Sequence, residues 1–309
     1  MMPTMPTMSE NARKRRRRER NRMSKLKRSA RLVDMTQYLL ANPHRLIPLG
    51  TFVDRYRSAK SSISEDLAII RDVLADRELG ELVTVAGAAG GVKYVPKIGE
   101  AEARSFIDDV CRQLDQPERI LPGGYLYMSD LLGRPEVVGR IGRMFASAFA
   151  DREPDVVMTV ETKGIPIACA TAQWLNVPVV IVRRDNRVTE GSSVNINYVS
   201  GSSKRIRTMS LARRALKENA RVLIVDDFMR AGGTVKGMMD LLQEFSASVQ
   251  GVGVFVESGD VGEGEHLVTD YLSLAKLAGV DPATKKIRIE PGNYFAKLSE
   301  KKGADSVGH

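Results

Sequence analysis

Cysteine is scarce in this chain: Cys111 and Cys169 are the only two among 309 residues. Two cysteines so far apart predict neither a disulfide framework nor a metal site, and we expect both in the core of a protein from a reducing compartment. Long apolar runs are missing as well, because no stretch approaches eighteen consecutive apolar residues and no hydrophobic segment follows the basic N-terminus. These absences predict a cytoplasmic protein that is not exported and has no membrane partner.

Positive charge is concentrated at the start of the chain. Residues 1–22 hold eight Lys or Arg against Glu10 and Glu19, so they carry +6 of the total formal charge of +9. Such a run is typical either of a solvated, disordered tail or of a segment that adds phosphate contacts on DNA. We assign residues 1–28 to a basic, disordered tail, and Met23 is an alternative translation start because the folded pattern begins only near Ser29.

The most informative segment is residues 222–234, which read VLIVDDFMRAGGT. Apolar residues followed by two carboxylates and a glycine turn predict a buried parallel strand that runs into the N-terminus of a helix. Backbone amides of such a turn bind one anion, since glycine allows close approach and the helix end carries partial positive charge. Asp226 and Asp227 supply acceptors for two vicinal hydroxyls, so the segment predicts a site for a ribose 5-phosphate group.

This segment resembles the phosphoribosyl pyrophosphate motif of type I phosphoribosyltransferases over all thirteen residues. The resemblance assigns ribose and 5-phosphate binding to nine consecutive residues: Asp226, Asp227, Phe228, Met229, Arg230, Ala231, Gly232, Gly233 and Thr234. A receiver-type acid pair is the alternative, but it lacks the Gly-Gly-Thr turn. Arg230 and Ala231 replace the small and hydroxyl residues common in the enzymes, which weakens the case for catalysis more than the case for binding.

A second strand-turn-helix pattern, VETKGIPIA, begins at Val160. A strand end, a glycine turn and a helix start predict another anion site at the same sheet edge, although an ordinary connection has the same composition. In the resembled family this position binds pyrophosphate. The residues that correspond here are Glu161, Thr162, Lys163 and Gly164.

Residues 29–95 have the order helix, helix, helix, hairpin, which is the layout of a winged helix-turn-helix domain. The third helix has an apolar face of Ile63, Leu67, Ile70 and Leu74, and Ser62 followed by Glu65 predicts a capping box at its start. A hairpin with the glycine-rich turn AGAAGG follows as the predicted wing. A helical dimerisation module with a hairpin is the alternative.

Short polar and basic residues suit contacts with base edges and phosphates. They lie at the entrance to this domain, at the start of the third helix and on the hairpin. The predicted DNA-binding residues are Arg28, Arg31, Lys60, Ser61, Ser62, Ser64 and Lys93.

Residues 96–296 alternate strands and helices, so the chain is predicted to be an α/β protein whose second domain contains a parallel sheet. The expected helices cover 98–115 and begin near Pro135, the expected strands are 155–160, 179–182, 221–226 and 249–256, and 297–309 form a C-terminal tail. Residues 183–216 are too polar for a core and are expected to form a flexible loop over the ligand. Tyr125 and Lys204 are possible ligand contacts, and Tyr125 and Phe228 equally suit packing.

Together, a winged helix-turn-helix followed by a type I phosphoribosyltransferase parallel-sheet domain resembles the purine operon repressors of Gram-positive bacteria. The resemblance implies a homodimer that binds double-stranded operator DNA and is released by phosphoribosyl pyrophosphate, with Mg²⁺ accompanying the diphosphate, no catalytic residues, no catalytic cofactor and no dedicated metal cage. Guanosine tetraphosphate is an implied competitor. The alternative is a xanthine- or adenine-type phosphoribosyltransferase enzyme with an accessory helical domain.

Overall fold

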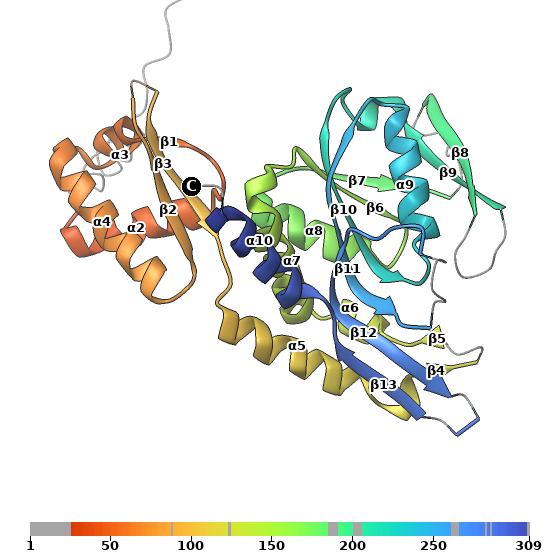
Figure 1. The fold of residues 1–309 in the computed structure, drawn as a ribbon. Helices are drawn as coiled ribbons and strands as arrows, with labels where there is room; N and C mark the ends of the chain where they lie inside the picture. The colour runs from red at the N-terminus through yellow and green to blue at the C-terminus, as the bar shows by residue number, and fades with distance from the viewer. Residues whose placement is uncertain are drawn as a thin grey trace, which may run out of the picture. The chain divides into compact units, whose positions relative to one another are not determined.

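The chain divides between Val95 and Pro96 into two compact units, at the boundary expected from the sequence (Figure 1). The computed structural model describes residues 26–87, 89–122, 125–184, 191–199, 206–260, 266–281, 283–284 and 286–307. Each unit has its own hydrophobic core. The two units are therefore described separately.

The N-terminal unit contains helices α2, α3 and α4 and a three-stranded sheet in the order β1-β3-β2. In chain order its elements are α2 (Arg28–Leu40), β1 (Ile47–Pro48), α3 (Leu49–Tyr56), α4 (Lys60–Asp76), β2 (Gly80–Val85) and β3 (Gly91–Pro96). This order confirms the predicted winged helix, with the β2–β3 hairpin as the wing.

Apolar residues at helical spacing form the core of this unit. Met35 and Leu39 of α2, Phe52 of α3, and the predicted face of α4 are all buried. The predicted capping box is wrong, because α4 begins at Lys60 and Ala59 is its N-cap residue, so Ser62 already lies in the first turn. Arg57, at the C-cap of α3, has a φ of 48°, and this left-handed residue starts the turn into α4.

The second unit is built on a six-stranded sheet in the order β13-β12-β11-β10-β6-β7, in which only β13 runs antiparallel to its neighbour. Its first half comprises α5 (Glu100–Leu114), η1 (Pro117–Arg119), β4 (Ile120–Leu121), β5 (Tyr125–Leu126), α6 (Ser129–Leu132), α7 (Pro135–Phe149), η2 (Ala150–Arg152), β6 (Val156–Val160), α8 (Ile165–Leu175) and β7 (Val179–Val182). Its second half comprises β8 (Ser193–Val199), β9 (Ile206–Ala212), η4 (Arg213–Ala215), β10 (Arg221–Met229), α9 (Gly233–Gln243), β11 (Ser248–Ser258), β12 (Leu272–Asp281), β13 (Lys286–Pro291) and α10 (Tyr294–Val307).

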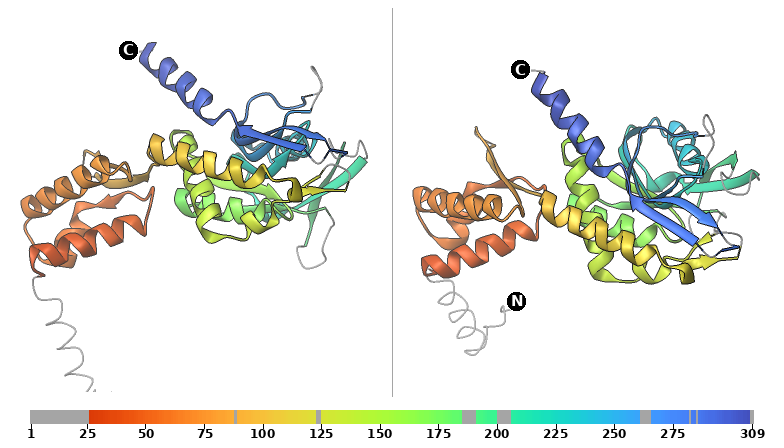
Figure 2. Two further views of the ribbon diagram at one scale, coloured as in Figure 1. Left: turned by 90° about the horizontal axis from the view of Figure 1, so that it is seen from below. Right: turned by 60° about the horizontal axis from the view of Figure 1, so that its bottom comes forward.

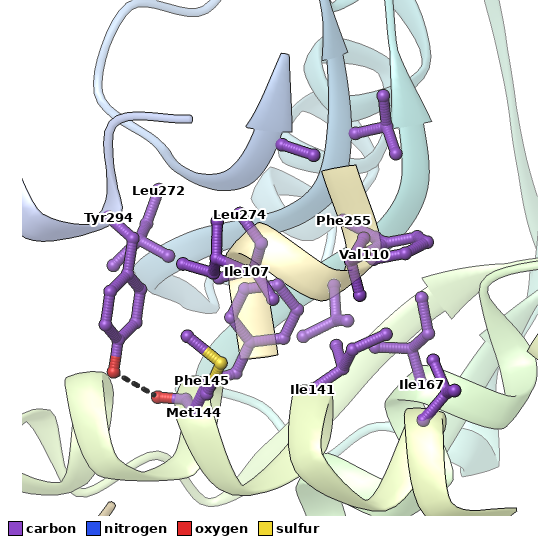
Figure 3. Packing of buried hydrophobic residues seen from close by; sticks show 14 of the residues in the cluster. Ile107, Val110, Ile141, Met144, Phe145, Ile167, Phe255, Leu272, Leu274 and Tyr294 are labelled. Carbon is purple, nitrogen blue, oxygen red and sulfur yellow. Dashed lines mark hydrogen bonds between the residues drawn. The ribbon is translucent and has the colours of Figure 1, made fainter. Parts of the chain in front are cut away.

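Figure 2 shows helices on both sides of this sheet. Each face of the sheet packs against a different hydrophobic cluster. Alternation along β10 illustrates the division: Leu223 and Val225 belong to the cluster with α5, α7 and α8, whereas Val222 and Ile224 belong to the cluster with α9. The first cluster is shown in Figure 3, where Ile107, Ile141, Phe145, Ile167 and Phe255 are labelled among the packed side chains. Coverage of both faces is expected for a parallel sheet.

The predicted parallel strands are all present, but the sheet is larger than expected. Strands β12 and β13 extend it at one edge, and neither was predicted. The prediction that 183–216 form only a polar loop is wrong, because β8 and β9 pair as an antiparallel hairpin. Its buried residues include Val194 and Tyr198, which alternate with polar residues, and this period-two pattern had been obscured by the Ser- and Asn-rich composition.

Three smaller expectations also need correction. The segment after residue 297 is not a tail, since α10 continues to Val307. Cys111 is buried as expected, but Cys169 is exposed on α8. Helical spacing with Phe106, Val110 and Leu114 predicts that Ala101 lies on the apolar face of α5, but Ala101 is exposed and Ala103 is buried instead.

Candidate functional site

The predicted phosphate turn lies between β10 and α9. Gly232 has a φ of +80°, and a side chain there would also press on Val268 at 3.2 Å, so both the backbone and the space require glycine. The Leu267 amide donates a hydrogen bond to the Ala231 carbonyl at 2.9 Å, and this bond stabilises the turn. Helix α9 begins directly afterwards at Gly233, so its unpaired N-terminal amides face the turn.

A small cavity occupies this turn. Its volume is about 80 Å³, and its lining consists of Asp226, Phe228, Met229, Arg230, Ala231, Gly232, Gly233, Thr234 and Val235. All but the last of these residues belong to the set predicted for ribose and 5-phosphate binding; Asp227 lies beside them on β10. The size and the helix N-terminus suit one phosphate group.

The second predicted loop connects β6 to α8 and lies beside the first, because β6 and β10 are adjacent parallel strands. Its Glu161–Thr162 peptide bond is cis. Thr162 and Lys163 are exposed, whereas Gly164 is buried at the start of α8. A Cβ at Gly164 would collide with Thr159 Oγ1 and stand 3.1 Å from Asp226 Oδ1. The two loops therefore meet at the carboxyl edge of the sheet, where open α/β sheets bind ligands.

Glu161 differs from its loop neighbours because its carboxylate already has protein partners. The Arg184 amide donates to Glu161 Oε1 at 2.8 Å, and Arg183 Nη1 lies 3.3 Å from Glu161 Oε2. The backbone of Arg183 is hydrogen bonded in both directions to the backbone of Ser210 in β9. Glu161 thus links the predicted pyrophosphate loop to the end of β7, and the exposed Thr162 and Lys163 are better placed for an incoming anion.

The carboxylate pair has unusual electrostatics. Asp226 is 3% exposed, and burial, reinforced by the charge of Asp227, raises the pKa of its carboxyl group well above 3.8. Burial also raises the pKa of Asp227, although a hydrogen bond from the protonated Asp226 carboxyl group and the charges of Lys163 and Arg184 oppose the shift. An adjacent acid pair in such surroundings favours binding of hydroxyl donors or a cation, since either stabilises the ionised form.

A larger cavity of about 730 Å³ adjoins the small one and shares Phe228 and Arg230 with it. Its lining comes from the β4–β5 hairpin, both loops and the ends of β11 and β12: Leu121, Pro122, Tyr125, Leu126, Met128, Lys163, Asp227, Phe228, Arg230, Ser258, Asp260, Leu277, Gly279 and Val280. Tyr125 lies at this cavity with 61% of its surface exposed. Arg230 Nη2 pairs with Asp260 Oδ2 at 3.0 Å, and this ion pair joins the phosphate turn to the end of β11.

Several of these lining residues were missed in the sequence. Ser258 and Asp260 follow the predicted strand that became β11, and polar residues at the carboxyl end of a parallel strand are the signal that would have identified them. Leu277, Gly279 and Val280 belong to β12, a strand that was not predicted. Lys204, the other possible ligand contact, lies outside the described residues.

The candidate nucleic-acid interface is in the N-terminal unit. Lys60, Ser61 and Ser64 are exposed in the first turns of α4, while Ser62 is half-buried. Ser64 Oγ donates to the Lys60 carbonyl at 3.0 Å. Lys93 is half-buried on β3 of the wing. The structure therefore brings the predicted polar residues of α4 to one surface.

The two predicted arginines differ. Arg28 is exposed at the start of α2, but Arg31 is 8% exposed and hydrogen bonded to Asp66. Arg31 lies one turn before Met35, on the buried stripe of α2, so the structure does not present its side chain on the surface where the predicted DNA contact would require it. Among the described helices, none is long and apolar enough to cross a membrane. No group of three or more His, Cys, Asp or Glu side chains in that part of the chain is placed to hold a metal ion.

Comparisons with known proteins assign both units. Residues 27–96 match the family described as bacterial purine repressor, N-terminal, and residues 128–282 match the phosphoribosyl transferase domain. The chain is 59% identical over 271 residues to the purine biosynthesis transcriptional repressor PurR of Bacillus subtilis, which covers 88% of this chain and 94% of that protein. It is 44% identical over 270 residues to the purine biosynthesis transcriptional activator PurR of Lactococcus lactis subsp. lactis, covering 87% of this chain and 99% of that protein.

An enzyme also matches, over less of the chain. The xanthine phosphoribosyltransferase of Bifidobacterium adolescentis is 31% identical over 182 residues, which cover 56% of this chain and 94% of that protein. The two PurR proteins, whose matches extend along both units, are named as transcriptional regulators.

Proposed function

The chain belongs to the PurR family of purine biosynthesis transcriptional regulators, and on this basis we propose that it represses purine biosynthesis genes until phosphoribosyl pyrophosphate releases it from its operator. It is a transcriptional regulator that contains a phosphoribosyltransferase-like domain. We propose three features of this regulation: the protein represses its genes, phosphoribosyl pyrophosphate is its effector, and the effector weakens operator binding.

The observation that carries the proposal is the meeting of the two loops at one sheet edge in a chain that also contains a winged helix. The small cavity receives the 5-phosphate at the amides of Ala231 to Thr234. Asp226 and Asp227 accept hydrogen bonds from the ribose hydroxyls. The diphosphate extends toward Thr162 and Lys163, where the loop amides and the Lys163 ammonium balance its charge.

Magnesium fits this arrangement as a companion of the diphosphate. Asp226 and Asp227 provide hard oxygen ligands, and Mg²⁺ in such sites keeps several waters and uses the substrate phosphates as further ligands. The cation supplies charge neutralisation when it is bound. Its arrival also favours ionisation of the two carboxyl groups, whose pKa values are raised in the free protein.

The relatives differ in the direction of regulation: the Bacillus subtilis protein is named a repressor and the Lactococcus lactis protein an activator. We choose repression because identity to the repressor is 59% and to the activator 44%. Effector and DNA are then coupled reciprocally: if the effector weakens operator binding, the operator weakens effector binding by the same factor, commonly ~1 to 3 kcal/mol.

The larger cavity supports guanosine tetraphosphate as a competitor. A purine ring that stacks against Tyr125 or Phe228 would occupy this cavity while the two anion loops hold the phosphates. Phosphoribosyl pyrophosphate has no base, so it would leave much of the same volume to solvent. Both ligands need the same phosphate sites and would exclude each other.

Purine phosphoribosyltransferase activity is the second candidate function. It is favoured by the same large cavity beside the phosphate turn and by the match to the xanthine phosphoribosyltransferase. Arg230 and Ala231 weigh against the enzyme, because they replace the small and hydroxyl residues that are common at these positions in the enzymes. Incubating the protein with phosphoribosyl pyrophosphate and each purine base, and finding nucleotide formed at turnover, would support the enzyme.

Operator binding in the presence of the effector tests the proposal directly. A labelled operator duplex is titrated with the full chain at fixed salt, with and without phosphoribosyl pyrophosphate and Mg²⁺, using ribose 5-phosphate as the control ligand. We expect the diphosphate-bearing ligand to weaken operator binding and the control to do so much less. Unchanged operator affinity with the effector at saturation would defeat the proposal.

We also propose a homodimer that acts in the cytoplasm on a palindromic operator, because two copies of the winged helix match two half-sites.

A further inference from the structure

One buried carboxylate in the DNA-binding unit is shared by two arginines. Asp66, in the second turn of α4, has no exposed surface. Arg28 Nε donates to Asp66 Oδ1 at 3.0 Å, and Arg31 Nε donates to Asp66 Oδ2. Because α4 is the helix expected to enter the major groove, this cluster ties the DNA-reading helix to the start of α2.

Arg31 reaches a third element as well. Its Nη1 lies 3.2 Å from Ser58 Oγ, in the turn between α3 and α4, and Ser58 Oγ donates to the Tyr56 carbonyl at 3.2 Å. The Arg31 side chain is 9% exposed. One guanidinium therefore contacts α4 and the turn that sets the angle between α3 and α4, and it does so from inside the unit.

Arg28 uses the same carboxylate from the outside. Its side chain is 54% exposed, and its Nη2 also lies 3.6 Å from Oε2 of Glu65, which is 67% exposed. A guanidinium carries five N–H donors in a planar fork, so a few acidic contacts leave donors directed at solvent. Asp66 and Glu65 thus hold a positive group beside the first turns of α4, on the surface of the unit.

Burial decides which arginine can move. Breaking a buried, hydrogen-bonded ion pair leaves a desolvated charge, whereas an exposed pair is weak and exchanges readily with other partners. Arg31 therefore stays with Asp66 when DNA arrives, while Arg28 can offer its free donors to a phosphate without leaving Asp66.

We propose that Arg28 and Arg31 have different tasks in DNA binding: Arg31, through Asp66 and Ser58, is a positioning residue that fixes the angle of α4, and Arg28 contacts a DNA phosphate next to that helix. The inference rests on the proposed operator binding. It predicts that Arg31 controls how well operator is distinguished from other DNA, and that Arg28 controls affinity for any DNA.

Salt dependence separates the two tasks. Loss of one phosphate contact reduces the slope of log K against log salt by about 0.9 and weakens binding to all sequences alike. Loss of a positioning residue leaves the slope unchanged and lowers the ratio of operator to scrambled-duplex affinity. A residue that only stabilises the fold changes neither, once the protein is folded at the temperature of measurement.

The experiment uses the full chain and its Arg28→Gln, Arg31→Met and Ser58→Ala variants, with Arg112→Gln as control, because Arg112 pairs with Asp109 on the exposed side of α5 in the other unit. Affinities for operator and scrambled duplexes are measured by fluorescence anisotropy between about 50 and 200 mM salt, and circular dichroism verifies folding. We expect Arg28→Gln to reduce the slope for both duplexes. Arg31→Met should keep the slope and lower the affinity ratio by about tenfold or more, which corresponds to about 1.4 kcal/mol, and Ser58→Ala should lower the ratio less.

Several outcomes overturn the inference. If Arg31→Met reduces the slope as Arg28→Gln does, Arg31 contacts phosphate; if it lowers only the melting temperature, the cluster serves stability alone. Should Arg31→Met fail to fold, Arg31→Lys keeps the charge while losing the fork that spans Asp66 and Ser58, and an unchanged affinity ratio in that variant counts against positioning. If the unaltered protein shows no preference for operator, the proposed function itself fails, which is a different result.

Discussion

Gly164 lies against the carboxylate of Asp226, so closely that a Cβ on Gly164 would stand 3.1 Å from Asp226 Oδ1. The two residues are far apart in sequence and belong to the two separate loops predicted to bind the diphosphate and the sugar phosphate. Their contact means that the loops share a wall, and a change in one alters the shape of the other.

Replacing Gly164 by alanine should therefore damage ligand binding. The new methyl group must displace Thr159 or Asp226, both buried, and overpacking of this kind costs about 1 to 3 kcal/mol. Isothermal titration calorimetry with phosphoribosyl pyrophosphate measures the loss, and thermal unfolding measures the stability. Gly139→Ala is the matched control, because nothing lies within 4 Å of its Cβ position in α7 and alanine there stabilises the helix by about 0.5 to 1 kcal/mol. Equal ligand affinity in both variants would contradict the shared wall.

Replacing Asp226 and Asp227 by alanine should uncouple the regulator from its effector. Hydrogen bonds from hydroxyls to charged acceptors contribute about 1.5 to 3 kcal/mol, so effector affinity should fall by roughly ten- to a hundredfold. Operator affinity without effector should stay unchanged, because these carboxylates belong to the other unit. Reporter expression that still responds normally to phosphoribosyl pyrophosphate in the double variant would reject the site.

Stability of the effector domain should depend on pH through Asp226. Burial raises the pKa of Asp226 in the folded state, so the folded protein binds this proton more tightly than the unfolded chain does. The resulting stabilisation is fully present below the unfolded pKa and is lost as the pH rises through the raised folded pKa. Thermal melts across this range should show the decline, and Asp226→Asn should flatten it. A variant with the same pH profile as the unaltered protein would rule out Asp226 as its source.

Tyr125→Ala should distinguish the two proposed ligands. Base stacking on an aromatic ring contributes about 1 to 3 kcal/mol, so guanosine tetraphosphate affinity should fall by roughly tenfold. Phosphoribosyl pyrophosphate has no base to stack and should bind as before. Tyr127→Ala is a suitable control, since Tyr127 is also exposed and does not line the cavity. A similar loss for both ligands would mean that Tyr125 shapes the cavity instead of stacking.

Glu161→Gln should strengthen binding of the diphosphate. The amide still accepts the Arg184 N–H bond, but it no longer places a negative charge beside the loop or holds Arg183 by charge. Affinity for phosphoribosyl pyrophosphate should rise at low salt, while affinity for ribose 5-phosphate should not change. Weaker binding of the diphosphate ligand in this variant would show that Glu161 is needed to position the loop.

Much of the architecture could be predicted from the sequence because local patterns agree with the fold. The apolar stripe of α4 and the strand-turn-helix patterns at Asp226 and Gly164 are short-range signals, and the structure places them as expected. The β8–β9 hairpin was missed because its buried Val194 and Tyr198 alternate with asparagine and serine, so composition suggested a loop. Its burial depends on α9, which follows much later in the chain.

Side-chain partners were harder to predict than elements. Arg31 carries a charge, and charge alone indicates the surface; its burial depends on Asp66, which lies 35 residues away and is itself without exposed surface. The Arg230–Asp260 and Glu161–Arg183 pairs likewise join residues from different strand ends. Long-range pairs of this kind have no periodicity in the sequence, so only the assembled sheet reveals them.

Helix α9 is held firmly at both its end and its side. Its first turn forms the phosphate cavity, and one turn later Gly237 approaches Tyr198 and Met209 of the β8–β9 hairpin so closely that an added Cβ would stand about 3 Å from each. With no compressible space between them, the helix cannot slide along its axis without carrying the hairpin with it. Any shift of the first turn of α9 toward a bound anion would therefore have to shift the β8–β9 hairpin as well.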